Sequence, residues 1–367
     1  MRFNCVSIEL HKFSVKYILQ KCRTIIIYSM KSYTFWNNKG GTGKTSLCFQ
    51  CVLEYAIKHN DERVLVVDLC PQANLSEFLL GGMENNGASN LSSLYDSNPR
   101  RSIGGYFESR MQSPFAYSTT INPLDYISSP HQMNANIPSN VDLIAGDRLV
   151  ELQSSFISSL TANKIPSVNT YITVVSWLRD LFQHLEDYDV VFIDTNPSFS
   201  IYTQIALAAT ERLVVPVMAD DSSKRALSNV LSLVYGYNLP SKIYAQYTFN
   251  TELTNAGMVL PQIHLIVKNR ITQYMGTAAA YRGVLASIDN EINTMMAVNR
   301  QYFTGNNVIM EVRDFQSSGV AAFAEAKSFR QLQDDRRVRI IGGEQVQLDI
   351  NQIRNNLNSI SAIVDRL

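Results

Sequence analysis

The sequence lacks net charge, a paired set of cysteines and any long apolar run, and each absence excludes a class of protein. Lysine plus arginine and aspartate plus glutamate both number 32 among the 367 residues. A DNA-binding surface could therefore only be a local basic patch, because phosphate contacts require clustered cations. The five cysteines are odd in number and form no disulfide framework, which predicts a reducing, cytoplasmic location. No apolar stretch reaches the roughly 18 residues of a membrane-spanning helix.

What is present is a chain that is 46% hydrophobic, enough to bury a sizeable core. Short apolar runs ending in an acid or a turn predict buried strands at residues 31–37, 64–68, 190–194, 212–217 and 264–267. Helical spacing between them, for example at 45–58, 173–185 and 202–209, indicates crossover connections. The predicted fold class is α/β, with a mostly parallel sheet and helices on both faces.

The chain divides into three predicted parts. Residues 1–30 form an N-terminal extension, for which we favour an over-extended start codon over a tail or a helix packed on the domain. Residues 31–340 form the main domain, which carries a surface insertion rich in Gly, Asn, Ser and Pro at about 81–140. After residue 269 the chain looks largely helical, with helices at 278–296 and 319–329. Residues 341–367 form a helical tail whose single apolar stripe packs on the domain.

A glycine-rich turn between the first strand and the first helix is typical of a phosphate-binding P-loop. Backbone N–H groups of such a loop surround phosphate oxygens, and the positive end of the helix adds to the attraction. We expect Lys44 to reach the β- and γ-phosphates of ATP and the Thr45 hydroxyl to ligate Mg²⁺. Asn38 stands where the strict pattern has glycine, and asparagine tolerates left-handed backbone. The predicted binding residues are Asn38, Lys39, Gly40, Gly41, Thr42, Gly43, Lys44, Thr45 and Ser46.

A second lysine, Lys39, lies inside this loop although a phosphate cradle does not need it. The heptapeptide at 39–45 (KGGTGKT) resembles the deviant Walker A motif of the ParA/MinD family of P-loop ATPases. The resemblance implies that Lys39 reaches across a nucleotide-sandwich homodimer to the partner's phosphates. It also implies that Lys39 and Lys44 stabilise the charge that develops during hydrolysis.

Residues 64–76 (VLVVDLCPQANLS) resemble the family's second motif, with Asp68, Pro71 and Gln72 matching. Cys70 stands where the family has the aspartate expected to orient the attacking water, and a thiol is a poor substitute for a carboxylate. Three interpretations stay open. Hydrolysis is very slow and ATP acts as a long-lived switch, or Asp68 takes over the catalytic role, or a carboxylate from the insertion or a partner completes the site.

Residues 188–198 (YDVVFIDTNPS) resemble the family's Walker B strand, which implies that Asp194 holds a magnesium-bound water. Asn196 replaces a residue that is often proline in the family, and residues 195–198 would sense the γ-phosphate. Asn269 sits where the family reads adenine with an asparagine amide. Residues 141–144 and 313–326 also resemble family segments, so that the resemblance covers most of 31–340 except 81–140.

Three weaker patterns carry alternatives. The Cys48-x-x-Cys51 pair has no further ligands at suitable spacing, so buried helix cysteines are favoured over a metal site. Arginines near the C-terminus form either a DNA-binding patch, as in family members, or a solvated face; they are Arg330, Arg336, Arg337 and Arg339, with Arg270 and Arg282 as possible additions. The last helix has too few cations for a membrane anchor, so no stable membrane insertion is expected.

The leading hypothesis is an ATPase that dimerises with ATP and segregates or positions DNA, as in plasmid or chromosome partition, with a separate DNA-binding adaptor protein. In its ATP state it would bind DNA nonspecifically and associate with the nucleoid. One alternative is a MinD-like spatial regulator at a membrane. The other is a nucleotide-gated binding module with little turnover, because of Cys70.

Overall fold

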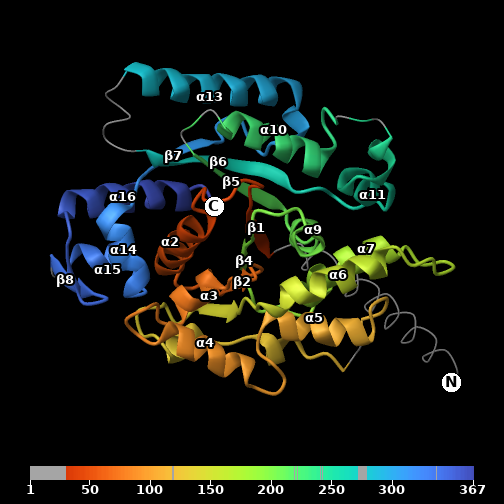
Figure 1. The fold of residues 1–367 in the computed structure, drawn as a ribbon, viewed down its shortest axis with the longest axis horizontal. Helices are drawn as coiled ribbons and strands as arrows, with labels where there is room; N and C mark the ends of the chain where they lie inside the picture. The colour runs from red at the N-terminus through yellow and green to blue at the C-terminus, as the bar shows by residue number, and fades with distance from the viewer. Residues whose placement is uncertain are drawn as a thin grey trace, which may run out of the picture.

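A computed structural model of the chain describes residues 30–367 except 118–119, 219, 221, 240, 242, 272–278 and 336, and leaves the side chains of 279–282 undescribed. Seven of the described strands form one parallel sheet of order β3-β2-β4-β1-β5-β6-β7 (Figure 1). They are β1 (Lys31–Phe35), β2 (Val64–Asp68), β3 (Val141–Ile144), β4 (Val190–Asp194), β5 (Arg212–Met218), β6 (Gln262–Ile271) and β7 (Ile309–Arg313). The prediction of a parallel α/β sheet is confirmed.

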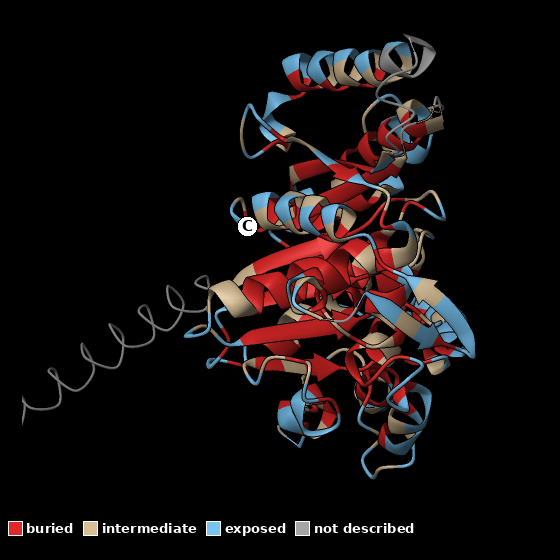
Figure 2. Ribbon diagram, turned by 90° about the vertical axis from the view of Figure 1, so that its left-hand side faces the viewer, coloured by how far each residue is buried: buried red, intermediate tan, exposed pale blue. Residues whose placement is uncertain are grey.

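The inner strands are buried over most or all of their length, as continuous apolar runs require when helices cover both faces. All five residues of β2 and of β4 are buried, and Figure 2 shows the sheet as the buried centre of the molecule. β1 lies between β4 and β5, and the pairing of β2 with β4 places Asp68 opposite Asp194. Two acids therefore meet at the carboxyl edge of the sheet, beside the end of β1.

Each face of the sheet has its own hydrophobic core. One face is covered by α2 (Lys44–Lys58), α3 (Asn74–Leu79), α4 (Gly87–Tyr95), α14 (Gln316–Ala324), α15 (Phe329–Gln333) and α16 (Ile350–Val364). The other face is covered by α5 (Ile103–Gln112), α6 (Leu149–Thr161), α7 (Thr170–Val175), α8 (Trp177–Phe182), α9 (Ile201–Ala208), α10 (Ser222–Tyr235), α11 (Phe249–Asn255) and α13 (Ala279–Val298). Single 3-10 turns occur at η1 (Pro123–Tyr126), η2 (Pro130–Gln132), η3 (Tyr244–Tyr247) and η4 (Arg300–Tyr302).

The region after residue 269 is less helical than expected. β7 adds a seventh strand, and β8 (Val338–Ile341) with β9 (Glu344–Gln347) forms an antiparallel hairpin. β7 was not predicted because it is an edge strand with Val312 as its one fully buried residue, so that it lacks a continuous apolar run. The helix expected at 173–185 is divided at Ser176 into α7 and α8, and the one expected at 319–329 is divided into α14 and α15.

The segment at 81–140 contains α4 and α5 and contributes to the core as well as to the surface. Tyr106 and Phe107 of α5 are completely buried against the sheet.

At the C-terminal end, α16 packs on α2 and β7, and the carbonyl of Leu367 accepts a hydrogen bond from the Tyr33 hydroxyl. No helix in the described ranges combines the length and the apolarity needed to cross a bilayer. The expectations for residues 1–29 lie outside the described residues.

Candidate nucleotide-binding site

The loop between β1 and α2 has the backbone of an anion cradle. Gly41 and Gly43 adopt left-handed conformations with φ of 73° and 79°. At Gly43 a side chain is also excluded by space, because a Cβ atom there would overlap the amide nitrogen of Asn269. α2 then begins at Lys44, so its free N–H groups and its positive end face the loop.

Lys44 lies within the cradle that it is expected to serve. Its side chain is 7% exposed, and its Nζ donates to the backbone carbonyl of Lys39 at 3.3 Å. Burial lowers the pKa of Lys44, and the negative charge of Asp194 opposes that shift. A buried ammonium with one long hydrogen bond to a neutral carbonyl is electrostatically under-compensated. A phosphate group would supply the missing negative charge.

The two residues expected at the magnesium ion are brought together. The Thr45 hydroxyl donates to Oδ2 of Asp194 at 2.7 Å. Burial, followed by the charge of Asp68, raises the pKa of Asp194 to about 8. Its Oδ1, together with Oγ1 of Thr42 and Oδ1 of Asn38, is buried without a hydrogen-bond partner among the described residues. Oxygen donors of this kind suit Mg²⁺ and its bound waters, so the residues present fit the ion.

Lys39 points away from the cradle. Its Nζ contacts Oδ2 of Asp220 at 2.7 Å and the hydroxyl of Ser222, where β5 gives way to α10. Partial burial alone would raise the pKa of Asp220, but hydrogen bonds from Lys39, Ser222 and Ser223 outweigh it and lower that pKa. The structure thus separates the two lysines of the loop: Lys44 faces the phosphate position, and Lys39 lies outside it.

Asp68 is buried and its carboxylate is fully engaged. It accepts hydrogen bonds from the backbone of Cys70 at 3.0 Å, the backbone of Ser76 at 2.9 Å and the hydroxyl of Ser76 at 2.8 Å. Burial raises its pKa to about 6. These contacts hold the loop after β2, and a role for Asp68 in catalysis stays a prediction. Burial, with the charge of Asp68, raises the pKa of the Cys70 thiol to about 12, so that Cys70 is no thiolate at neutral pH.

Asn269 is located beside the phosphate loop, at the carboxyl end of β6. Its Nδ2 donates to the Thr42 carbonyl at 3.0 Å, and its Oδ1 accepts from the backbone of Arg270. A cavity of about 200 Å³ opens here between the start of α2 and α14, lined in part by Ser46, Arg270, Phe315 and Gln316. Adenine recognition by Asn269 stays a prediction. Ser46 was among the predicted binding residues, but Arg270, Phe315 and Gln316 were not predicted at this site. The one feature of the sequence that could have indicated these three residues is their position at or just after the ends of β6 and β7.

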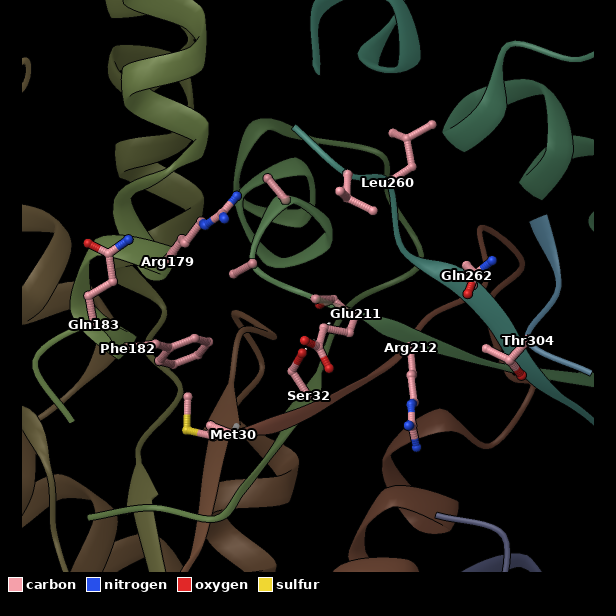
Figure 3. Close-up of a pocket in the computed structure, with 14 residues that line it drawn as sticks. Met30, Ser32, Arg179, Phe182, Gln183, Glu211, Arg212, Leu260, Gln262 and Thr304 are labelled. Atoms are coloured by element: carbon pink, nitrogen blue, oxygen red, sulfur yellow. Dashed lines mark hydrogen bonds between the residues drawn. The ribbon is translucent and has the colours of Figure 1, made fainter. Parts of the chain in front are cut away.

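A larger cavity, of about 780 Å³, lies at the opposite edge of the sheet and does not touch the P-loop. Figure 3 shows its wall where β1 and β5 begin, with Ser32, Glu211 and Arg212, and with Phe182 of α8 on the other side. Its wall combines charged side chains of both signs, such as Glu211 and Arg212, with apolar side chains such as Phe182. The phosphate site is therefore assigned from its backbone and its lysine rather than from cavity size.

Two of the arginines considered as a DNA patch are engaged in ion pairs within the chain. Arg330 pairs with Glu54 of α2 through two nitrogens, and Arg339 pairs with Glu325 at 2.9 Å and Asp335 at 2.6 Å. Arg336 and the side chain of Arg282 lie outside the described residues.

Cys48 and Cys51 are fully buried. The described residues contain no group of three or more His, Cys, Asp or Glu side chains that could hold a metal ion.

Comparison with known proteins gives one family over more than half of the chain. Residues 30–242 match the AAA domain family (AAA_31). The chain is 26% identical over 215 residues to the virulence plasmid ParA family protein pGP5-D of Chlamydia muridarum, covering 59% of this chain and 65% of that protein. It is 25% identical over 227 residues to the sporulation initiation inhibitor protein Soj of Bacillus subtilis, covering 62% and 70%. The chain thus spans less than two thirds of the first of these relatives.

Solved structures show the same fold. A complex of a Cyanothece McdA variant with ATP superposes with a TM-score of 0.57 at 16% identity, covering 92% of this chain and 97% of that one. A plasmid partition protein of Borrelia burgdorferi bound to AMPPNP gives 0.51 at 15% identity, covering 92% and 100%. At these identities the likeness concerns the arrangement of strands and helices only.

Proposed function

Because this chain belongs to the AAA domain family as a ParA-like P-loop ATPase, we propose that it dimerises with ATP to segregate or position DNA through a separate adaptor protein. Nucleotide hydrolysis is a general property of P-loop ATPases. The dimer, the DNA, the adaptor and association with the nucleoid are the proposed part. Relatives named as plasmid-partitioning and ParA family proteins support it.

The observation that carries the proposal is the separation of the two lysines in one loop. Lys44 faces the cradle and suffices for the phosphates of its own chain, whereas Lys39 extends toward Asp220 at 29% side-chain exposure. A partly exposed lysine beside a phosphate site, not needed by that site, suits the phosphates of a second copy facing it. A cation supplied in trans would stabilise the charge that develops on the transferred phosphoryl group.

The cofactor roles follow from the same residues. The N–H groups of residues 40–45 would surround the phosphates of ATP, with Ser46 and Asn269 beside the cavity at the start of α2. Thr45 and Asp194 would hold Mg²⁺, directly and through bound water respectively. Magnesium would neutralise negative charge between the β- and γ-phosphates.

The test is the mass of the protein in solution with ATP and Mg²⁺, measured by light scattering after gel filtration. We expect the wild type to shift from monomer to dimer and Lys39→Ala to bind ATP yet remain a monomer. Lys44→Ala should lose ATP binding itself, so that the two lysines separate binding from pairing. A Lys39→Ala protein that dimerises as well as the wild type would refute the role assigned to Lys39. Absence of DNA binding by the ATP-bound wild type at low salt would refute the partition function.

A nucleotide-gated binding module with little turnover is a second candidate, favoured by the protonated Cys70 thiol. Its signature would be tight ATP retention with turnover near zero, and Cys70→Asp should then raise the rate of hydrolysis.

A MinD-like regulator at a membrane is less well supported, because α16 buries Ile353, Ile360 and Ile363 against the domain. Sedimentation with liposomes in ATP tests it, and we expect the protein to stay in the supernatant.

A further inference from the structure

A chain of hydrogen bonds links the loop after β4 to the start of α6. The amide Nδ2 of Asn196 and the hydroxyl of Tyr202 are hydrogen-bonded, and the Tyr202 hydroxyl lies 3.1 Å from Oε2 of Glu151. The other end of the amide, Oδ1, accepts from the hydroxyls of Ser198 at 2.9 Å and Thr203 at 3.2 Å. Asn196 is thereby held from both ends.

The charge of Glu151 fixes the direction of these bonds. An ionised carboxylate only accepts hydrogen bonds, so the Tyr202 hydroxyl donates to Glu151 and must accept from Asn196. The amide therefore presents its NH₂ group to Tyr202 and its oxygen to Ser198 and Thr203. One N–H of Asn196 is used in this way, and its second N–H has no hydrogen bond among those of the described residues.

The loop that carries Asn196 adjoins the phosphate cradle. The Thr195 hydroxyl donates to the carbonyl of Phe35 at 2.9 Å, and the Trp36 indole donates to the carbonyl of Ser198 at 3.2 Å. A Cβ atom placed on Gly40 would come within 3.9 Å of Cγ of Pro197. The residues on both sides of Asn196 are thus hydrogen-bonded to the end of β1, and Pro197 lies next to the loop that would surround the phosphates.

Three of the carboxylates near this edge of the sheet are already committed to other contacts. Asp68 holds the loop after β2, Asp220 pairs with Lys39, and Asp147 pairs with Arg100 at the end of β3. Cys70 offers a protonated thiol. Asp194 keeps one oxygen without a partner among the described residues, but it is the residue expected at Mg²⁺. These four acids are thus engaged by other groups or assigned to the ion. Such a site favours stabilisation of charge on the transferred phosphoryl group over removal of a proton from water.

We propose that Asn196 is a catalytic residue, which donates its free N–H to the γ-phosphoryl group of ATP, and that Tyr202 and Glu151 are positioning residues that hold it there. The inference rests on the ATP hydrolysis of the proposed function. Water adds to the γ-phosphorus, the bond to the bridging oxygen of ADP breaks, and the proton of the water leaves with inorganic phosphate. The negative charge that grows on the phosphoryl oxygens in this step is what the N–H stabilises.

The test compares ground-state and transition-state binding. Loss of one preorganised donor typically costs about 100-fold in turnover, so we expect Asn196→Ala to lower kcat by about that factor. Its affinity for ADP with aluminium fluoride should fall in parallel, while its affinity for AMPPNP changes less than about threefold, because only the transition state needs the donor. Tyr202→Phe keeps the buried ring and removes the hydroxyl, and it should lower kcat by about 10-fold.

Tyr171→Phe is the matched control. The Tyr171 hydroxyl donates to Gln204 at 2.6 Å, so this variant also removes a tyrosine hydroxyl bonded to α9, but away from the phosphate loop. We expect its kcat to stay within about twofold of the wild type. Melting temperatures report whether each variant is folded.

Three results would overturn the inference. One is an Asn196→Ala or Tyr202→Phe protein, folded and ATP-binding, with the kcat of the wild type. Another is an equal loss of affinity for AMPPNP and for ADP with aluminium fluoride, and the last is no measurable hydrolysis by the wild type. Dimerisation with ATP is measured on the same samples. Intact dimerisation with an unaffected kcat refutes only this inference, whereas failure to dimerise refutes the proposed function.

Discussion

Removing the carboxylate of Asp220 should strengthen the proposed ATP-dependent dimer. Lys39 contacts Asp220 within its own chain at 2.7 Å, and that contact must break before Lys39 can reach a partner's phosphates. The side chains of the pair are 29% and 47% exposed, so the contact is worth about 0.5–1 kcal/mol rather than the value of a buried pair. Two such contacts are lost per dimer, which amounts to about 1–2 kcal/mol, or roughly 5- to 30-fold in the dimer dissociation constant.

The assay is sedimentation equilibrium of Asp220→Ala with AMPPNP and Mg²⁺, so that hydrolysis does not reverse the association. Asp365→Ala is the matched control, because it removes an aspartate that contacts Lys58 at 2.6 Å with 24% and 65% exposure, far from the P-loop. We expect tighter dimers for Asp220→Ala and an unchanged dissociation constant for Asp365→Ala. A weaker Asp220→Ala dimer would refute the reasoning, because it would mean that Asp220 stabilises the paired state instead.

Three further predictions concern the site and its surroundings. Gly43→Ala should abolish ATP binding and lower the free energy of unfolding by roughly 1–2 kcal/mol, since the φ of Gly43 is 79° and the new methyl overlaps Asn269. Calorimetry with ATP measures the first effect and thermal unfolding the second. Iodoacetamide at pH 8 should leave Cys70 unmodified in the folded protein, because this residue is 8% exposed and its thiol has a pKa of about 12. Mass spectrometry should find the modified residue only after unfolding in urea, and modification of the folded protein would contradict the prediction. Arg330→Ala should leave DNA affinity and its salt dependence unchanged, because the guanidinium is engaged by Glu54; a reduced salt slope in filter binding would contradict this.

Much of the fold could be predicted because its central strands are continuous apolar runs. β2 and β4 could be predicted from the apolar runs at Val64–Asp68 and Val190–Asp194, because residues buried on both faces of a sheet are apolar without interruption. β7 could not be found in this way, because it lies at the edge of the sheet and Val312 is the one buried residue among its five. The order of the strands in the sheet could not be predicted either, since it depends on contacts between β1 and strands that are distant in sequence, β4 and β5.

The phosphate loop could be predicted because its chemistry is local in sequence. Glycines, a lysine and a threonine within a few residues specify a backbone shape and a charge. Asp220 and Glu151 could not be predicted as partners of Lys39 and Tyr202, because each contact joins segments that are distant in sequence. The only available signal was that Asp220 follows directly on a buried strand, at the carboxyl edge where ligands bind in open parallel sheets.

The place of β1 at the centre of the sheet constrains how the protein is made. β1 is synthesised first, but its neighbours are β4 and β5, which emerge much later. At about 5–20 residues per second, the ribosome needs on the order of ten seconds to deliver them. During that time Phe35, Trp36 and the apolar side of α2 have no completed core to enter. The nascent chain should therefore depend on chaperones until β5 has left the exit tunnel.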